Sequence, residues 1–400
     1  MKRIIIVGAG ASGLTLAIKL SDKNKVTLLE KNSDIGKKLL LTGSGRCNYY
    51  NEDMDKFHFY TDSNVSLDDF ISENKKALDF YNDLGIIPSI KNGYYYPFSN
   101  TSTSVVNSIK RVLLQKNVNL ITNYEVKKIE NINDEFIVND ELKSDVLVLA
   151  TGGLSYPKTG STGDGYRFLK DFNLNIINTI PSLISLKSDC PFQKKWSGIR
   201  LNAKLSLYEE DALSKEEKGE VLLTDYGISG ICTFNISSIA SRGLSKGKKE
   251  EVIINFVDFL NIESKADFIT YLDNRDKEYD LNKVYELFDG FINYKLVNVL
   301  LGKYKDKKWS KLKREEKDII ASLFYELKLP ILGTSGIEKA QVTSGGLDLN
   351  EVDLNTFEVK KVKNLYVIGE LLDINGDCGG YNLTMCTLSA IKVGESIDKN

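Results

Sequence analysis

Three glycines near the N-terminus, Gly8, Gly10 and Gly13, have the spacing of a dinucleotide-binding turn. They follow the apolar run IIIV and precede a stretch with helical periodicity, and the next apolar run, VTLL, ends at Glu30. In such a turn the first glycine permits a tight bend, the second lets the backbone approach a pyrophosphate, and the third lets helix and strand pack closely. The helix N-terminus favours phosphate, and the acid can bind ribose hydroxyls. The sequence therefore predicts a dinucleotide site.

Two further glycine-rich segments narrow this prediction. The apolar run DVLVLA ends at Thr151 and Gly152, and the run NLYVIG near the C-terminus is followed by Glu370 and later by the glycine pair 379–380. Glycines let the backbone lie close to a cofactor. A helix that begins at a glycine pair can direct its N-terminus toward an electron-rich ring such as a flavin. Because two remote segments would close around one long cofactor, the pattern favours FAD.

Composition limits the other possibilities. The chain has 400 residues, 42% of them hydrophobic and 27% charged, which is typical of a soluble protein with two or three domains. The net charge of −2 argues against a nucleic-acid partner. No apolar run reaches the ~18 residues of a membrane span. The five cysteines are scattered and no signal peptide is recognisable, so we expect a cytoplasmic protein. The single histidine, His58, predicts no metal site, and we expect it in a solvated loop.

The order of segments predicts an interrupted domain. A β-α-β start gives way after Pro181 to short β segments, then to a charged helical stretch, and finally to a strand, a glycine loop and a closing helix. The tail strand LYVIGE has no sheet of its own and needs the N-terminal sheet for burial. The lysine-rich run KYKDKKWSKLKREEK is interpreted as a solvated helix face rather than a site for an acidic partner. We expect an FAD-binding domain at 1–182 and 342–400, a β-rich domain at 183–258 and 326–341, and a helical subdomain at 259–325.

Several motifs together resemble one protein family. They are GAGASGL, GKKLLLTGSGRCN, LATGGLSYPKTGSTGDGY and GELLDINGDCGGYNL, and they span nearly the whole chain. They are similar to those of the bacterial FAD flavoproteins called YhiN-like or BaiN-like, also labelled aminoacetone oxidase family enzymes. The resemblance implies an α/β, two-dinucleotide-binding-domain flavoprotein fold (FAD Rossmann-like) with an inserted β-rich domain and a helical subdomain.

The resemblance also implies a set of FAD contacts. Together with Ala11 of the N-terminal motif, the expected cofactor-binding residues are Gly8, Gly10, Ser12, Gly13, Glu30, Lys31, Lys38, Arg46, Cys47, Asn48, Val126, Thr151, Gly152, Gly369, Glu370, Asp373, Gly379, Gly380, Tyr381, Asn382 and Leu383. The chain departs from the family pattern at Asp225, where a histidine is common, at Ile231, where a proline is common, and after the final Asn-Leu pair. These departures put an inherited substrate in doubt, but not FAD binding.

The leading interpretation is an FAD-dependent oxidoreductase. Hydride would pass between flavin N5 and a small organic substrate, and the family includes a member proposed to reduce a carbon–carbon double bond. No second glycine motif suggests a dedicated NAD(P)H domain, so NAD(P)H as electron donor would dock transiently. Tyr156 lies in the specific run SYPKTGSTGDGY and is the candidate proton donor.

Three alternatives stay open. A fumarate-reductase-like flavoprotein needs a cationic cluster to hold a dicarboxylate, for which Arg200 and Arg242 are the candidates. An RNA-modifying flavoprotein needs a basic face, to which a net charge of −2 gives little support. A regulatory flavin-binding protein would carry the cofactor without turnover.

Overall fold

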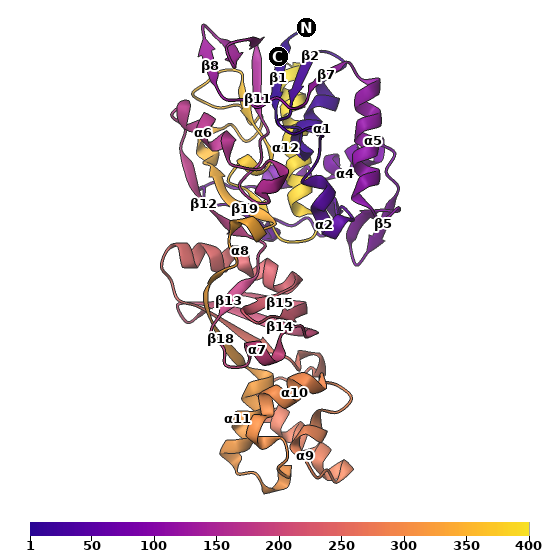
Figure 1. Cartoon of the computed structure of the whole chain (residues 1–400), viewed down its shortest axis with the longest axis vertical. Coiled ribbons are helices and arrows are strands. Elements are labelled where there is room, and N and C mark those ends of the chain that lie inside the picture. Colours follow the sequence, from indigo (N-terminus) through magenta and orange to yellow (C-terminus); the bar gives the residue numbers. More distant parts are fainter. Residues whose placement is uncertain (400) are drawn as a thin grey trace. The chain divides into compact units, whose positions relative to one another are not determined.

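The protein divides into two compact units in its computed structural model, which describes residues 1–399 (Figure 1). The first unit comprises Met1–Pro181 and Ile337–Asn400, and the second comprises Ser182–Gly336. Each unit has its own hydrophobic core.

A five-stranded parallel sheet forms the centre of the first unit. Its order is β20-β11-β1-β2-β7, with bounds β1 (Arg3–Val7), β2 (Lys25–Leu29), β7 (Val118–Ile121), β11 (Val146–Leu149) and β20 (Leu365–Val367). β20 comes from the C-terminal segment and pairs with β11 in parallel, with Leu147 opposite Leu365. The prediction that the tail strand joins the N-terminal sheet is therefore confirmed.

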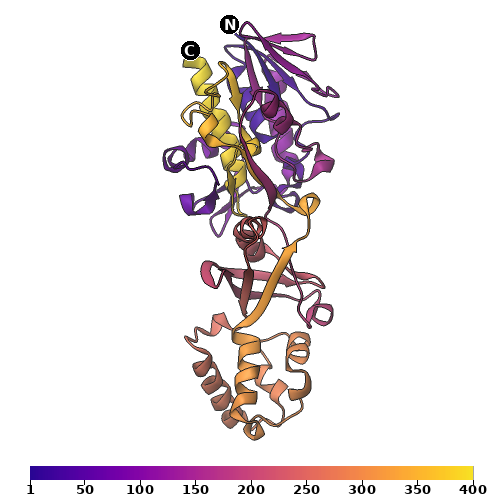
Figure 2. The same ribbon diagram turned by 90° about the vertical axis from the view of Figure 1, so that its left-hand side faces the viewer.

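Different layers cover the two faces of this sheet (Figure 2). On one face α1 (Ala11–Leu20) contacts α12 (Tyr381–Lys399) and α5 (Ser102–Gln115), and α12 is buried along most of its length. On the other face lies the antiparallel sheet β10-β9-β8, which contacts β1 and β11. Its strands are β8 (Ile129–Ile132), β9 (Glu135–Val138) and β10 (Leu142–Ser144).

Shorter elements complete the first unit. The helices are α2 (Thr42–Gly45), α3 (Asp68–Ser72), α4 (Lys75–Asp83) and α6 (Asp164–Asp171). Three small sheets pair β12 (Ile176–Ser182) with β19 (Val342–Leu347), β21 (Asn375–Gly376) with β4 (Phe59–Tyr60), and β6 (Tyr94–Pro97) with both β3 (Tyr50–Asn51) and β5 (Pro88–Lys91). Two of these pairings join the N-terminal and C-terminal segments, so the interrupted first unit is held together by strands as well as by its core.

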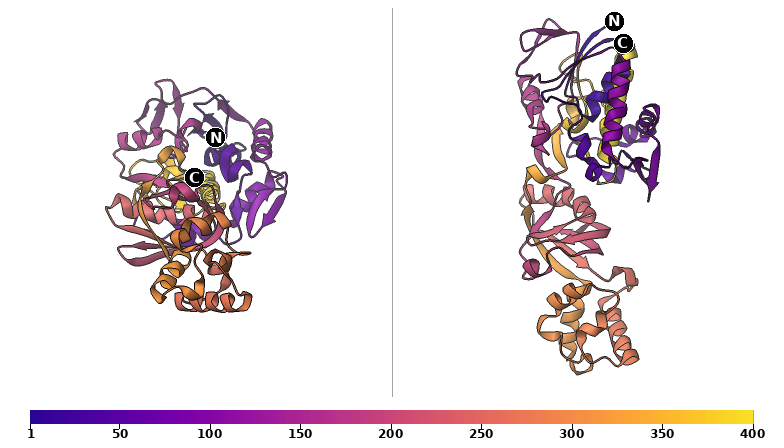
Figure 3. Two further views of the ribbon diagram at one scale, coloured as in Figure 1. Left: turned by 60° about the horizontal axis from the view of Figure 1, so that its bottom comes forward. Right: turned by 45° about the vertical axis from the view of Figure 1, so that its right-hand side comes forward.

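The second unit is a closed barrel with a helical segment inserted in it (Figure 3). The barrel order is β13-β16-β15-β14-β17-β18. Its strands are β13 (Leu186–Ser188), β14 (Arg200–Glu209), β15 (Ala212–Leu223), β16 (Gly227–Ser229), β17 (Glu250–Asn255) and β18 (Leu327–Thr334), with α7 (Gln193–Trp196) and α8 (Ile231–Ser245). Between β17 and β18 the chain forms α9 (Lys265–Tyr279), α10 (Tyr294–Leu301) and α11 (Arg314–Tyr325). Barrel and helices share one core.

Candidate functional site

The turn between β1 and α1 is shaped by its glycines. Gly8 has φ +108°, and a Cβ there would lie 2.4 Å from the carbonyl oxygen of Ala150 at the end of β11. A Cβ on Gly13 would lie 1.9 Å from the carbonyl oxygen of Gly8. At Gly10, by contrast, a Cβ would meet no atom of the described chain within 4 Å. Two glycines therefore permit close packing, and the third borders open space.

That space is a cleft within the first unit, with an empty volume of about 1160 Å³ including open solvent at its mouth. The wall is built at the carboxyl ends of β1, β2 and β11 and at the beginning of α12, where doubly wound folds bind their ligands. The expected site residues that line the cleft are Gly8, Gly10, Ala11, Ser12, Glu30, Lys31, Lys38, Val126, Thr151, Gly152, Glu370, Asn382 and Leu383.

The polar atoms of this wall fit FAD. Oε2 of Glu30 accepts from the N–H of Ala9 at 3.0 Å, and Oε1 accepts from the N–H of Asn32 at 2.9 Å and from its Nδ2 at 2.7 Å. The carboxylate is therefore fixed at the end of β2, and Oε2 retains a lone pair for a ribose hydroxyl. The hydroxyl of Thr151 is buried and has no hydrogen-bond partner among the described residues. Because buried hydroxyls are normally paired, this oxygen on the cleft wall suits a polar ligand.

Lys38 and Glu370 face each other across the wall of the cleft. Lys38 Nζ is 2.5 Å from Glu370 Oε2 and donates to Ser155 Oγ at 2.6 Å. The other carboxylate oxygen of Glu370 accepts from Ser155 Oγ at 2.8 Å and from the N–H of Thr343 at 2.9 Å. This network fixes the short helix η10 (Gly369–Leu371) against β19 and the loop after β2.

Other expected residues lie outside the lining of the cleft. They are Gly13, Arg46, Cys47, Asn48, Tyr156, Gly369, Asp373, Gly379, Gly380 and Tyr381. Some of them shape its surroundings, since a Cβ on Gly369 would lie 2.5 Å from Ser12 Oγ and one on Gly380 would lie 2.6 Å from the backbone of Tyr50.

Asp373 and Cys47 are both buried. Oδ2 of Asp373 accepts hydrogen bonds from Thr61 Oγ1 and from the N–H of Ser63, both at 2.8 Å, while Oδ1 has no partner among residues 1–399. Burial raises the pKa of this carboxyl. Burial also raises the pKa of Cys47 to about 12, so its thiol is protonated at neutral pH and is unsuited to redox chemistry.

The structure does not test the roles that we expect for Arg46 and Tyr156, so these roles stay predictions. The Arg46 guanidinium lies 4.8 Å from the centre of the Tyr96 ring. Tyr156 has φ +54°, in the left-handed region that non-glycine residues rarely adopt, at the start of the turn that leads to Gly160. Such strain is frequent near functional sites.

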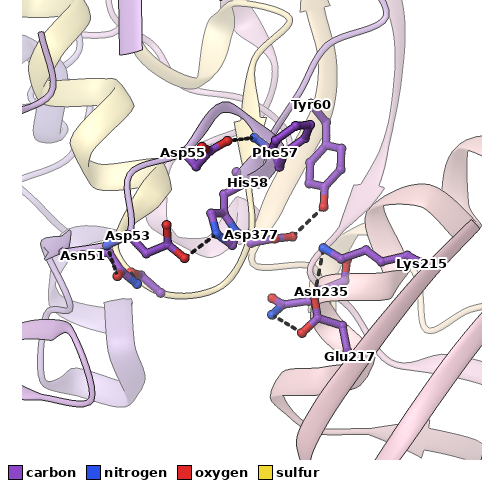
Figure 4. Close-up of polar contacts among 12 residues, drawn as sticks. Asn51, Asp53, Asp55, Phe57, His58, Tyr60, Lys215, Glu217, Asn235 and Asp377 are labelled. Atoms are coloured by element: carbon purple, nitrogen blue, oxygen red, sulfur yellow. Dashed lines mark hydrogen bonds and ion pairs between the residues drawn. The ribbon is translucent and has the colours of Figure 1, made fainter. Parts of the chain in front are cut away.

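His58 belongs to a polar cluster that the sequence did not predict (Figure 4). Its Nδ1 is 3.0 Å from Oδ2 of the buried Asp377, and its Nε2 is 3.2 Å from Oδ2 of Asp53. The ring stacks on Tyr381 with centroids 4.5 Å apart, and Tyr60 donates to Oδ1 of Asp377 at 2.9 Å. The hydrogen bond to Asp377 raises the pKa of His58. The expectation of a solvated loop histidine is wrong, because β4 pairs with β21 and brings His58 to Asp377.

Asn382 connects this His58 cluster to the cleft. Its Oδ1 accepts from the N–H of Gly376 at 2.8 Å, and its Nδ2 donates to the carbonyl oxygens of Gly376 at 2.9 Å and Asp377 at 3.2 Å. Asn382 and Leu383 also line the cleft. One segment, 376–383, therefore carries both a wall of the cleft and the buried carboxylate that holds His58.

Comparison with known proteins supports the same assignment. Residues 2–396 match the HI0933-like protein Rossmann domain. The chain belongs to this family. It is 31% identical over 404 residues to a 3-dehydro-bile acid delta(4,6)-reductase of Clostridium scindens, with 96% of each chain covered. It is 27% identical over 408 residues to a ribosomal RNA dihydrouridine synthase of Escherichia coli, covering 96% of this chain and 95% of that protein.

Solved structures show the same fold at low sequence identity. The 3-ketosteroid-delta4-(5alpha)-dehydrogenase of Rhodococcus jostii is 11% identical with a TM-score of 0.50, covering 100% of this chain and 97% of that structure. The 3-ketosteroid delta1-dehydrogenase of Sterolibacterium denitrificans is also 11% identical with a TM-score of 0.50, and both chains are covered completely. These likenesses concern the fold alone.

This chain is thus an FAD-dependent oxidoreductase with the α/β flavoprotein fold that the sequence predicted. Among residues 1–399, no helix combines the length and apolar character needed to cross a membrane. Within the same residues, no group of three or more His, Cys, Asp or Glu side chains could hold a metal ion.

Proposed function

We propose that this enzyme reduces a carbon–carbon double bond that is conjugated to a carbonyl group. The names of two relatives support this class of reaction, since one reduces the Δ4,6 bonds of a 3-dehydro bile acid and the other makes dihydrouridine. In a 3-oxo steroid and in uracil alike, the reducible bond is polarised by a neighbouring carbonyl. The substrate would therefore be either a steroid-like enone or a uracil base.

The protein has three tasks in such a reaction. FAD, when bound, supplies the hydride at N5. The chain must hold the cofactor, exclude water and deliver a proton to the carbon next to the carbonyl, so that one hydride and one proton together saturate the bond. NAD(P)H, docked transiently, is the proposed source of the next electron pair.

Holding the cofactor is assigned to the cleft. The N-terminus of α1 would face the pyrophosphate and Glu30 would bind ribose hydroxyls, as in other dinucleotide folds. Gly10 borders space that protein atoms leave open, and Thr151 presents an unpaired buried hydroxyl. The remaining FAD contacts expected from the sequence are proposed on the same basis.

We assign the role of proton donor to His58. Its ring lies between Asp377 and Asp53, and both carboxylates favour the imidazolium. The observation that carries this proposal is the segment 376–383, which joins the His58 cluster to the wall of the cleft. Tyr156 is the second candidate proton donor, and like His58 it lies outside the lining of the cleft.

The fumarate-reductase-like alternative has less support from its expected anchors. Arg200 lies on β14 and is ion-paired with Glu220 at 2.7 Å on an exposed part of the barrel. Arg242 donates to the carbonyl oxygen of Ser238 within α8. Neither contact makes a cationic pair that would hold a dicarboxylate.

Anaerobic flavin reoxidation tests the proposal. The FAD-loaded protein is reduced with NADH or NADPH and then mixed with a 3-oxo-4-ene steroid, a uridine-rich RNA or fumarate. We expect reoxidation by the steroid or the RNA, with a product that gains two hydrogens by mass spectrometry. Reoxidation by fumarate alone would favour the alternative, and a reduced flavin that none of the three reoxidises would refute the proposal.

A further inference from the structure

A short part of the second unit is strongly basic although the whole chain has a net charge of −2. Residues 295–314 contain seven lysines and one arginine but a single acid, Asp306. They run from α10 through the short helices η6 (Gly302–Tyr304) and η7 (Trp309–Lys311) to the first residue of α11. The net charge of the whole chain hides such a basic segment. The local positive charge depends on which of these lysines are paired with acids.

Some of these lysines are neutralised by acids. Lys307 lies 2.7 Å from Glu316, and Lys308 lies 3.6 Å from Asp280. Lys317, just beyond the segment, lies 2.6 Å from Asp273. The sequence predicted a solvated helix face for this run, whereas Lys307 and Lys308 lie between η6 and η7.

Three other lysines surround a hollow, which we call the lysine hollow. It is lined mainly by Lys195, Lys295, Lys305, Tyr294 and Asn298, with an empty volume of about 810 Å³ including open solvent. Lys195 comes from α7, which contacts α10. Within the part of the chain that the structure describes, none of the three lysines forms an ion pair, and the lining contains no acid.

The donors of the lysine hollow remain available to a ligand. Lys295 Nζ donates to the carbonyl oxygen of Ser197 at 2.8 Å, which uses one of its three N–H groups and none of its charge. Lys195 and Lys295 are exposed and Lys305 is half-buried. Three uncompensated ammonium groups around one concave surface favour a ligand with several negative charges.

Tyr294 adds an aromatic surface to these charges. The residue is 62% exposed, although tyrosine usually buries most of its ring. Tyr285 contacts it edge-to-face, with centroids 6.0 Å apart and an interplanar angle of 89°. The ring is thus held in place while most of its area faces solvent, which suits stacking of a nucleobase.

We infer that the lysine hollow is a docking surface for single-stranded RNA, in which the lysines contact phosphates and Tyr294 stacks on a base. Ammonium groups alone would suit any polyanion, but an exposed ring among them favours a nucleic acid over an acidic protein. The inference rests on the proposed function and selects, of its two substrate classes, a uracil base within RNA. It departs from the sequence-based expectation of no nucleic-acid partner.

Fluorescence anisotropy of the FAD-loaded full chain with a labelled, uridine-rich RNA of about 16 nucleotides tests this inference. Affinity is measured between about 50 and 200 mM KCl. Each phosphate contact to a single strand contributes about −0.7 to the slope of log K against log salt. Removing three contacts in the K195Q/K295Q/K305Q variant should therefore make this slope less negative by about 2. Tyr294→Ala should weaken binding about tenfold.

A matched control removes the same charge elsewhere. K127Q/K143Q/K361Q changes three exposed lysines of the first unit and should bind the RNA like the wild type. An equal loss in this control would overturn the inference, since net charge alone would then explain binding. Competition by polyglutamate as strong as that by RNA would also overturn it and indicate an acidic protein partner.

The same variants separate this inference from the proposed function. FAD binding after reconstitution should be unchanged in the lysine-hollow variants, because they leave the cleft intact. If RNA binding depends on the hollow but no double bond is reduced, the proposed function fails and the docking surface stands. If the enone is reduced but RNA binding ignores the hollow, the docking surface fails.

Discussion

At the scale of single residues, His58 is the most informative side chain. It is the only histidine in the chain, so one NMR signal of an untagged protein reports its titration. It lies between two carboxylates of different exposure, since Asp377 is buried and the Asp53 side chain is 73% exposed. This arrangement separates the effect of a buried partner from that of a solvated one.

We predict that Asp377→Asn lowers the pKa of His58 more than Asp53→Asn does. The folded-state pKa lies above the ordinary value of 6.5, so the stabilisation is full below that value and is lost as the pH rises through the folded-state pKa. Below pH 6.5, Asp377→Asn should cost about 1.5–3 kcal/mol of unfolding free energy, and Asp53→Asn about 0.2–1 kcal/mol. Urea unfolding and the titration of the imidazole C–H signal provide the measurements.

The same titration bears on catalysis. If His58 holds the proton, the rate of flavin reoxidation should fall as the pH rises through its folded-state pKa, and this limb should shift to lower pH in the Asp53→Asn variant. A pH profile that does not move with the NMR pKa would leave His58 with a structural role only.

At the scale of elements, the turn from β1 to α1 assigns different tasks to glycines that look equivalent in sequence. Gly8 needs its positive φ and its contact with Ala150 for the strand and helix to meet. Gly10 has an ordinary extended backbone, with φ −84°, and borders only the cleft. The first is a requirement of the fold and the second a requirement of the cofactor.

We predict that Gly8→Ala acts mainly on the stability of the protein, whereas Gly10→Val acts mainly on FAD binding. Gly8→Ala should lower the unfolding free energy of the apoprotein by about 1–3 kcal/mol or more, because it adds backbone strain and a close contact. Gly10→Val should change it by less than about 1 kcal/mol yet prevent FAD from binding. Urea unfolding and flavin absorbance after reconstitution measure the two effects, and a Gly10→Val protein that remains yellow would contradict the assignment of the cleft.

At the scale of the whole molecule, two separate cores imply two separable units. β12 and β19, which lead into and out of the second unit, pair with each other within the first unit. The chain therefore leaves the first unit and returns to it at two neighbouring strands, which a short linker could connect.

We predict that replacing residues 183–336 with a short Gly/Ser linker leaves a protein that unfolds cooperatively and binds FAD. This protein should lack the RNA affinity that we assign to the lysine hollow. Absorbance after reconstitution and the anisotropy assay measure both properties. A colourless but folded product would show that FAD binding needs residues of the second unit.

The sequence by itself determined the cofactor class and the family, and it predicted an interrupted first domain. These follow from local requirements, because positive φ at Gly8, close packing at Gly13 and an acid after the second strand must each be met within a few residues. The tail strand could also be assigned, since an apolar strand without a sheet must find one.

Only the tertiary structure decided which charged groups meet. His58 and Asp377 are 319 residues apart, and Lys38 and Glu370 are 332 apart. Sequence cannot predict such pairs, because the partners lie on remote segments and meet only when β4 pairs with β21 and β20 joins the N-terminal sheet. The same holds for the lysines, since among residues 1–399 Lys307 is paired with an acid, whereas Lys305, which lines the same hollow as Tyr294, is not.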